Sequence, residues 1–175
     1  MELTHKQLTD FYLWASEGRA HELQSALEHI DPGFDRHGFA SVLMGAAQFG
    51  HPECVNLLIP YADVAHDHSL CLQLAAEEGQ LECVKILLPH SNPNTLAVKP
   101  LRKALEFGHN ECAEFLFEWS NTNVALDVMC NEFPSQAEHW TRLFSDMEKR
   151  SSERVKQLLL EQIEDQGVDP CGRKM

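Results

Sequence analysis

The chain has 175 residues, of which 43% are apolar, and a formal net charge of −13 at pH 7. This length and composition allow one hydrophobic core, whereas the negative charge argues against nucleic-acid binding, because affinity for phosphate backbones comes largely from Lys and Arg. The same charge would repel an anionic membrane surface. We therefore expect a partner that is neither nucleic acid nor membrane.

The N-terminal segment, MELTHKQLTDFYLWASEG, has no basic stretch followed by an apolar run and so does not resemble a secretion signal. No apolar run reaches the roughly 18 residues that a membrane span needs. We expect a cytoplasmic protein.

The first predicted helix runs from Thr4, a candidate N-cap, to Ser16, because Leu8, Phe11, Tyr12 and Ala15 recur at helical spacing. A second helix is predicted over residues 20–29. The segment DPGFDRHG that follows, residues 31–38, has the Pro, Gly and Asp residues typical of a turn.

A motif then recurs at a fixed period. GHPECVNLLIP begins at Gly50, GQLECVKILLP at Gly79 and GHNECAEFLFE at Gly108, so successive copies start 29 residues apart. Each copy predicts a helix hairpin: 41–49, capped by Ser41, with a helix from Pro52; 70–78 with 81–88; and 99–107 with 110–119. A fixed period of this size indicates a stacked array.

After Ser120 the motif is absent, and helices are predicted over residues 124–131, 135–147 and 151–164. The expected organisation is one domain over residues 1–166. It comprises a divergent first repeat (4–31), three core repeats (38–119) and a helical C-terminal cap (120–166), followed by a mobile tail (167–175).

Three of the six cysteines, Cys54, Cys83 and Cys112, share one position of the repeat. Equivalent positions in a stacked array lie roughly 10 Å apart, which is beyond the reach of a disulfide. We therefore predict that they are buried apolar side chains in a reducing compartment. Cys130 and Cys171 lie outside the repeat frame and are predicted to be core and tail residues.

Two small residues, two variable residues and then Gly-His-x-Glu-Cys-Val-x-Leu-Leu form a frame that resembles the ankyrin repeat, best over residues 38–119. The resemblance implies an all-α, ankyrin-like solenoid of stacked helix hairpins. Because the unit here has 29 residues and the family's usual unit has about 33, we expect tight loops in place of β-hairpin fingers. His51 and His109 occupy a position where the family has a structural, hydrogen-bonding His.

The resemblance also implies that a protein partner binds on the concave face, at the variable pair before each Gly and at the loop tips. Those positions hold Ser16, Glu17, Gln48, Phe49, Glu77, Glu78, Glu106 and Phe107 in the pairs, and Arg36, His37, Phe39, Asp67 and His68 at the loop tips. We expect this face to be acidic. For Phe49 and Phe107 two interpretations stay open, exposed binding anchors or core residues.

No cofactor, metal site or catalytic residue is predicted. The loop sequence His66-Asp67-His68 suggests a metal, but ligands must converge to within about 2 Å of one point, and cysteines one repeat apart cannot do so. The chain contains no nucleophile elbow, phosphate-binding loop or His-Glu-x-x-His motif.

The sequence therefore predicts a non-catalytic module, a monomer or part of a heteromeric complex, that binds a basic partner protein and inhibits or positions it. An immunity or antitoxin-like role is one concrete form, suggested by the style of bacterial ankyrin repeats. Two alternatives stay open: an acidic mimic of nucleic acid, and an enzyme built on the C-terminal helices around Cys130, Glu138 and His139.

Overall fold

A computed structural model describes residues 5–31 and 35–165, which fold into helices without a β-strand. Thr4, the middle of the predicted turn (residues 32–34), Cys171 and the tail at 167–175 lie outside the described residues. The chain divides into two compact units, Met1–Ala125 and Leu126–Met175, where the sequence predicted one domain.

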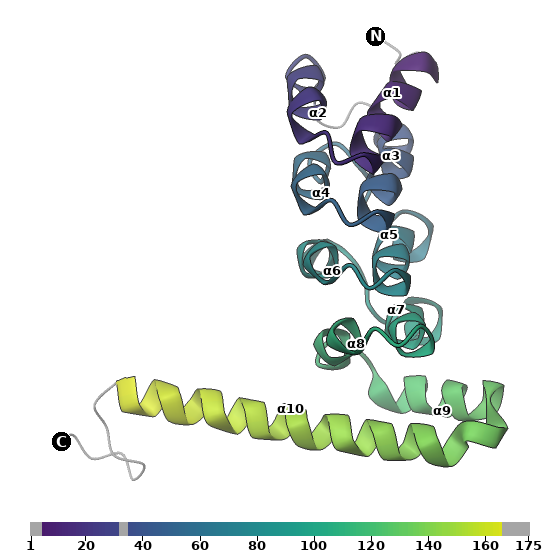
Figure 1. Ribbon diagram of the computed structural model, residues 1–175, viewed down its shortest axis with the longest axis vertical. Helices are drawn as coiled ribbons and strands as arrows, with labels where there is room; N and C mark the ends of the chain where they lie inside the picture. Colours follow the sequence, from purple (N-terminus) through teal and green to yellow (C-terminus); the bar gives the residue numbers. More distant parts are fainter. Residues whose placement is uncertain (1–4, 32–34, 166–175) are drawn as a thin grey trace. The chain divides into compact units, whose positions relative to one another are not determined.

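The first unit is a stack of four helix hairpins, and Figure 1 shows their first and second helices in two adjacent columns. In chain order the pairs are α1 (His5–Ser16) with α2 (Ala20–Leu27), α3 (Arg36–Gln48) with α4 (Pro52–Leu58), α5 (His66–Glu77) with α6 (Leu81–Leu87), and α7 (Thr95–Glu106) with α8 (Asn110–Phe117). A short 3-10 turn, η1 (Leu88–His90), follows α6. The predicted all-α, ankyrin-like solenoid is confirmed.

The core of the stack explains why the motif repeats. Leucines spaced 29 residues apart are fully buried on both columns: Leu43, Leu72 and Leu101 on the first helices, and Leu58, Leu87 and Leu116 on the second. Burial of each such side chain contributes roughly 1.5–3 kcal/mol. One hairpin cannot cover both of its apolar faces alone, so stacking is what makes each repeat stable.

The first helix of the second repeat begins earlier than predicted. Asp35 is its N-cap, and the Asp35 carboxylate accepts a hydrogen bond from the Gly38 N–H at 3.1 Å. Ser41, predicted to be the cap, therefore lies inside α3. In the second helix of the same hairpin, Pro52 occupies the first turn of α4 as predicted, where its missing N–H costs nothing.

Helices α5 and α7 each open with a left-handed turn. Residues 67–69 and 96–98 have φ between 46° and 62°, although none of them is glycine. The first turn is held from both sides, because the carbonyl oxygen of His68 accepts hydrogen bonds from Gln73 Nε2 at 2.8 Å and from Thr95 Oγ1 at 2.9 Å. These turns lie in the connections between hairpins, where the sequence predicted tight loops.

The second unit begins within α9 (Thr122–Glu132) and continues through η2 (Pro134–Gln136) into α10 (Ala137–Asp165). The two helices predicted over 135–147 and 151–164 are wrong, since α10 is continuous through both. Glu148, Lys149 and Arg150 are good helix formers, and the serines after them do not interrupt the helix. No helix among the described residues is long and apolar enough to cross a membrane.

Candidate protein-binding face

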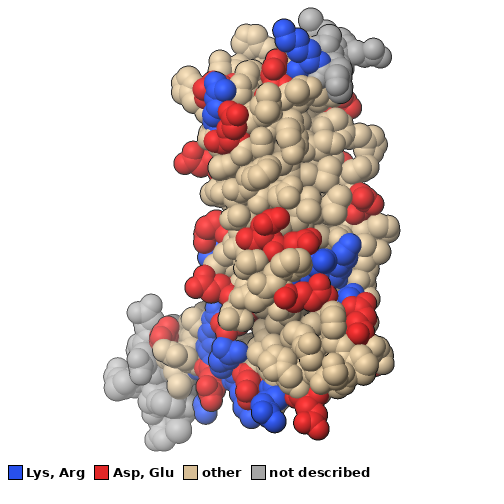
Figure 2. Space-filling view, turned by 45° about the vertical axis from the view of Figure 1, so that its right-hand side comes forward, with Lys and Arg blue, Asp and Glu red and all other residues tan. Residues whose placement is uncertain are grey.

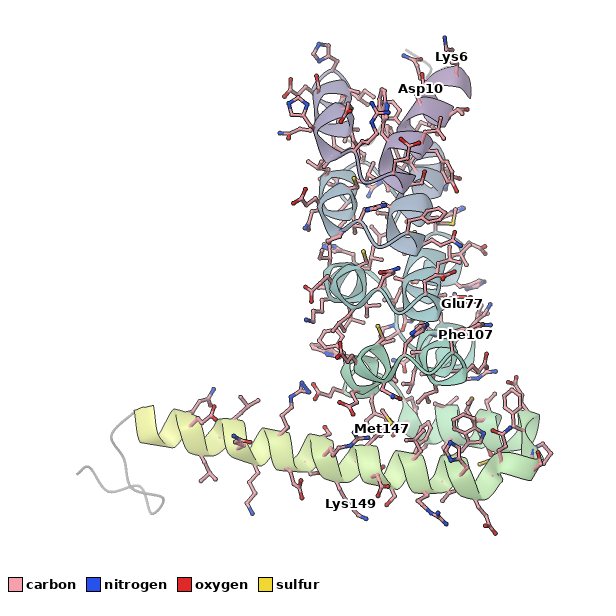
Figure 3. The ribbon with its side chains drawn as sticks, viewed as in Figure 1. Lys6, Asp10, Glu77, Phe107, Met147 and Lys149 are labelled. Atoms are coloured by element: carbon pink, nitrogen blue, oxygen red, sulfur yellow. The ribbon has the colours of Figure 1, made fainter. Side chains whose placement is uncertain are left out.

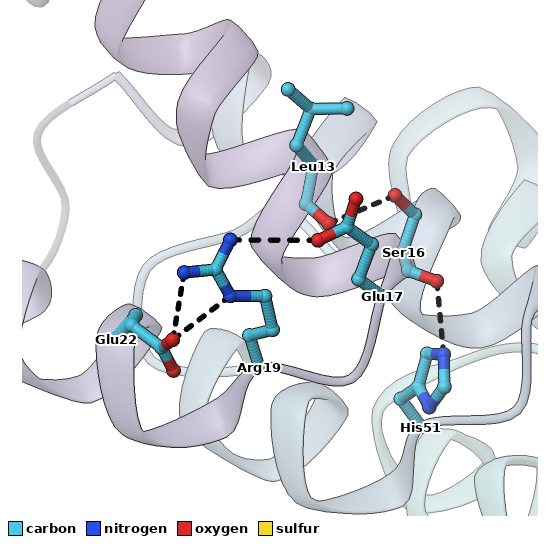
Figure 4. A network of polar contacts seen from close by, with 6 residues as sticks. All are labelled: Leu13, Ser16, Glu17, Arg19, Glu22 and His51. Carbon is cyan, nitrogen blue, oxygen red and sulfur yellow. Dashed lines mark hydrogen bonds and ion pairs between the residues drawn. The ribbon is translucent and has the colours of Figure 1, made fainter.

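A ladder of hydrogen bonds joins each repeat to the next through the first residue of the variable pair. His51 donates from Nε2 to the carbonyl oxygen of Ser16 at 2.9 Å (Figure 4), and His109 donates in the same way to the carbonyl oxygen of Glu77 at 2.9 Å. The prediction that these histidines are structural is confirmed. The ladder acts on the backbone of the pair's first residue and fixes where that residue lies.

Gln80 occupies the same motif position as the two histidines and makes the equivalent bond. Its side-chain Nε2 donates to the carbonyl oxygen of Gln48 at 3.4 Å. A single amide therefore replaces the imidazole in the middle of the ladder. The residue after the motif's Gly thus forms a contact between repeats. This structural contact is enough to explain why a hydrogen-bonding side chain recurs at that position.

In the first three repeats, the glycine that follows the variable pair makes room for the ladder residue of the following repeat. Gly18 has φ +73°, and a Cβ built there would lie 2.6 Å from Nδ1 of His51. Gly79 has φ +73° and is covered in the same way by the His109 ring. At Gly108, φ is +76° but no atom lies within 4 Å of the built Cβ. Gly79 is thus needed for both its backbone and its space, and Gly108 for its backbone.

The second residue of each variable pair is exposed. In successive repeats this position holds Glu17, Phe49, Glu78 and Phe107, and the last three are the C-caps of α3, α5 and α7. Phe49 is 53% exposed and Phe107 54%. These values exclude the interpretation of Phe49 and Phe107 as core residues, because both rings lie on the surface. We name the four residues the cap row.

Lys103, a first-helix residue of α7, changes the charge expected on this face. Its Nζ lies 3.5 Å from a carboxylate oxygen of Glu77 and 3.5 Å from one of Glu106, and 5.0 Å from the centre of the Phe107 ring. Figure 3 shows Glu77 and Phe107 on successive repeats, and Figure 2 shows acidic and basic side chains side by side on this face. Two of the predicted acids are therefore balanced by a cation.

Glu17 and Glu78, two further acids of the predicted site, also have partners. Arg19 Nη1 lies 3.5 Å from Glu17, and Arg19 donates from Nε and Nη2 to Glu22 at 2.9 and 2.7 Å (Figure 4). The hydrogen bonds from Arg19 lower the pKa of the Glu22 carboxyl. Glu78 accepts a hydrogen bond from Gln48 Nε2 at 3.5 Å. The face is polar and mixed in charge.

The prediction that Phe39 lies at a loop tip and binds a partner is wrong. It is fully buried, and its ring centre lies 5.4 Å from that of Phe11 and 5.8 Å from that of Tyr61. Phe39 is therefore a core residue that joins the first two repeats, and it is not available to a partner.

The remaining loop-tip residues are exposed but belong to helix starts. Arg36 and His37 lie in the first turn of α3, and Asp67 and His68 in the left-handed turn that opens α5. They therefore lie at the opposite end of the first helices from the cap row. The structure thus separates the predicted site into two groups.

The repeat thiols suit a core and not a nucleophile. Cys54, Cys71, Cys83 and Cys112 are buried and free, and Cys130 is half-buried. Burial raises the pKa of Cys71 to about 12 and that of Cys83 and Cys112 to about 11. A reactive cysteine needs the opposite shift and access, so the prediction that the repeat cysteines are core residues is confirmed.

The structure also brings together a group that the sequence analysis missed. His37, Asp63 and His66 present one ligand atom each, and these atoms all lie within 4.8 Å of one another. The residues that the sequence suggested as metal ligands were the neighbours His66, Asp67 and His68, together with the repeat cysteines. The available signal was the period itself, because His37 and His66 are 29 residues apart and therefore equivalent in adjacent repeats.

The structure is a repeat scaffold. Its helix hairpins are stacked and joined by the ladder of hydrogen bonds, and the cap row lies exposed at their variable positions. A family model described as ankyrin repeats (3 copies) matches residues 11–96 and 43–128, which together span more than half of the chain. The chain belongs to the ankyrin repeat family. Ankyrin repeats are protein–protein interaction modules and are typically non-catalytic. A comparison with curated proteins gave no match.

Proposed function

We propose that this chain binds a partner protein through the cap row and the first-helix residues beside it. The observation that carries the proposal is that Phe49 and Phe107 stand more than half exposed at equivalent positions of two repeats. Binding hot spots are commonly aromatic side chains that a partner can enclose fully. Between the two rings, the equivalent position of the third repeat holds Glu78.

Phe107 is held in place before any partner arrives. Lys103 lies 5.0 Å from the centre of its ring while it pairs with Glu77 and Glu106, each at 3.5 Å. A side chain that is already ordered loses less conformational entropy when it binds. Lys103 therefore supports Phe107 as an anchor, in addition to balancing the two carboxylates.

The alternation of ring and carboxylate favours a partner that presents arginine or lysine. A guanidinium can stack on the exposed face of a Phe ring and pair with the Glu78 carboxylate nearby in the row. The mixed charge around Lys103 disfavours the acidic mimic of nucleic acid, which needs carboxylates without intervening cations. That the partner is inhibited or positioned, and that the role is immunity or antitoxin-like, stay predictions.

The test is an affinity capture from cells that produce the chain, followed by direct binding measurements with the isolated partner. The double variant Phe49→Ala with Phe107→Ala should lower affinity by about 30-fold or more, because a hot-spot residue contributes at least about 2 kcal/mol. Trp119→Ala is the matched control, since this aromatic is 58% exposed but lies outside the cap row. Equal binding by the double variant and the control would overturn the proposal.

A further inference from the structure

The start of the first helices carries a second arrangement of polar side chains, at the end remote from the cap row. His37 lies in the first turn of α3, Asp63 in the connection after α4, and His66 at the first position of α5. We propose that His37, Asp63 and His66 form a binding site for a divalent metal ion of the zinc class.

Backbone contacts fix the connection that carries Asp63 against the start of α3. The Asp63 N–H donates to the carbonyl oxygen of Arg36 at 3.2 Å, and Arg36 Nη2 donates to the carbonyl oxygen of Ala62 at 3.2 Å. Ala62 and Val64 on either side are buried. The His66 N–H donates to the Asp63 carbonyl oxygen at 3.1 Å. All three candidate ligands therefore start from a fixed backbone.

The side-chain geometry is close to what an ion needs. The His37 and His66 ring centres are 5.0 Å apart with the rings tilted by 56°, and the three ligand atoms lie within 4.8 Å of one another. Ligands of a tetrahedral ion at about 2.0–2.2 Å are roughly 3.3 Å apart. Small rotations of the exposed His37 side chain and of the half-buried Asp63 and His66 side chains can close this difference.

The chemistry of the ligands selects the class of ion. Two imidazoles and one carboxylate suit zinc and its neighbours in the transition series, whereas magnesium and calcium prefer oxygen ligands alone. Three protein ligands leave one position open to water, or to a donor from another molecule.

The charge near the site also favours a cation. Asp35 and Asp67 lie next to the site in sequence and, with Asp63, outnumber the single positive charge of Arg36. The Arg36 side chain is engaged with the Ala62 carbonyl oxygen.

In the experiment, the full chain is first treated with a chelator to remove bound metal. It is then titrated with zinc chloride and followed by calorimetry. A second titration uses cobalt chloride as a spectroscopic probe. We expect one equivalent of zinc and the visible absorption of tetrahedral cobalt. Loss of a residue that only supports a metal ligand lowers metal affinity by about 10- to 100-fold. His37→Ala and His66→Ala each remove a ligand itself and should lower zinc affinity by at least as much. His68→Ala, an exposed histidine of the same region outside the group, should bind zinc like the parent chain.

Circular dichroism of each variant separates loss of the ligand from loss of the fold. An unchanged zinc affinity in the folded double variant His37→Ala with His66→Ala would overturn the proposal, as would the absence of zinc binding by the parent chain. A sulfur-to-cobalt charge-transfer band would also overturn it, because the ion would then be held by cysteine.

Discussion

The His109 ring covers Gly79, and His109 Nε2 donates to the carbonyl oxygen of Glu77 at 2.9 Å. One side chain of the fourth repeat thus holds both the turn and the variable pair of the third. Similar contacts connect His51 to Ser16 and Gln80 to Gln48. The contact repeated along the stack therefore sets the position of each exposed residue that follows the bonded carbonyl.

Substitution of two glycines by alanine separates two reasons for glycine at this position: the positive φ of the backbone and the space that a neighbouring side chain occupies. Gly79→Ala and Gly108→Ala both place a Cβ at positive φ, a strain of roughly 1–2 kcal/mol. Gly79→Ala should cost a further 0.5–1.5 kcal/mol or so, because His109 must move and lose its hydrogen bond. Urea unfolding of both variants measures the difference. Equal destabilisation would show that the His109 ring does not depend on the glycine.

Relief of a left-handed turn should stabilise the chain. Ala97 is exposed and has φ 56° in the turn that opens α7. Ala97→Gly should raise the free energy of unfolding by about 0.5–1 kcal/mol, since glycine adopts this conformation without strain. The control, Ala26→Gly in the regular helix α2, should lower it by about 0.5–1 kcal/mol. Changes of the same sign would contradict the left-handed turn.

Stability should fall at alkaline pH because of the buried thiols. Cys71 has a pKa raised by burial to about 12, from an ordinary value near 9. Between pH 9 and about 12, the Cys71 thiol keeps its proton in the folded chain and loses it in the unfolded chain. The stability linked to Cys71 is therefore fully present below pH 9 and is lost progressively between pH 9 and about 12.

The measurement is the free energy of unfolding against pH for the parent chain and Cys71→Ala. The variant should lose about 1.4 kcal/mol less per pH unit in this window. Leu72→Ala, which is destabilised but keeps every thiol, should retain the parent slope. An identical slope in Cys71→Ala and the parent would show that the thiol ionises equally in both states.

The sequence predicted the hairpins well because their period is local and regular. Leu58, Leu87 and Leu116 recur at one spacing, and the helices that carry them follow from that spacing. The starts of α5 and α7 were not predictable in the same way. Asp67 and His68 are types that tolerate positive φ, but the apolar residues at 96–98 adopt the same turn and do not favour it. The conformation depends instead on bonds from distant residues such as Thr95 to His68.

The motif alone gave the residues of the candidate site, but it did not give their exposure or their contacts. The variable pairs follow from the motif. Only the structure shows that the carbonyl oxygen of Glu77 accepts a hydrogen bond in the ladder, while the Phe107 side chain is exposed. Phe39 was assigned to a loop tip because it directly follows the predicted turn. Its contacts with Phe11 and Tyr61, which make it a core residue, join parts of the chain that are distant in sequence. The charge balance by Lys103 is equally non-local, since it depends on Glu77 of the preceding repeat.

The central claim is that the repeated motif builds the stack while the cap row binds. The most direct test is the affinity of an isolated partner for two triple variants. One is Phe49→Ala, Glu78→Lys and Phe107→Ala; the other reverses the exposed motif glutamates Glu53, Glu82 and Glu111 to Lys. We predict a loss of about 100-fold or more for the first and nearly unchanged affinity for the second. A partner that binds the first variant normally and the second poorly would contradict the account.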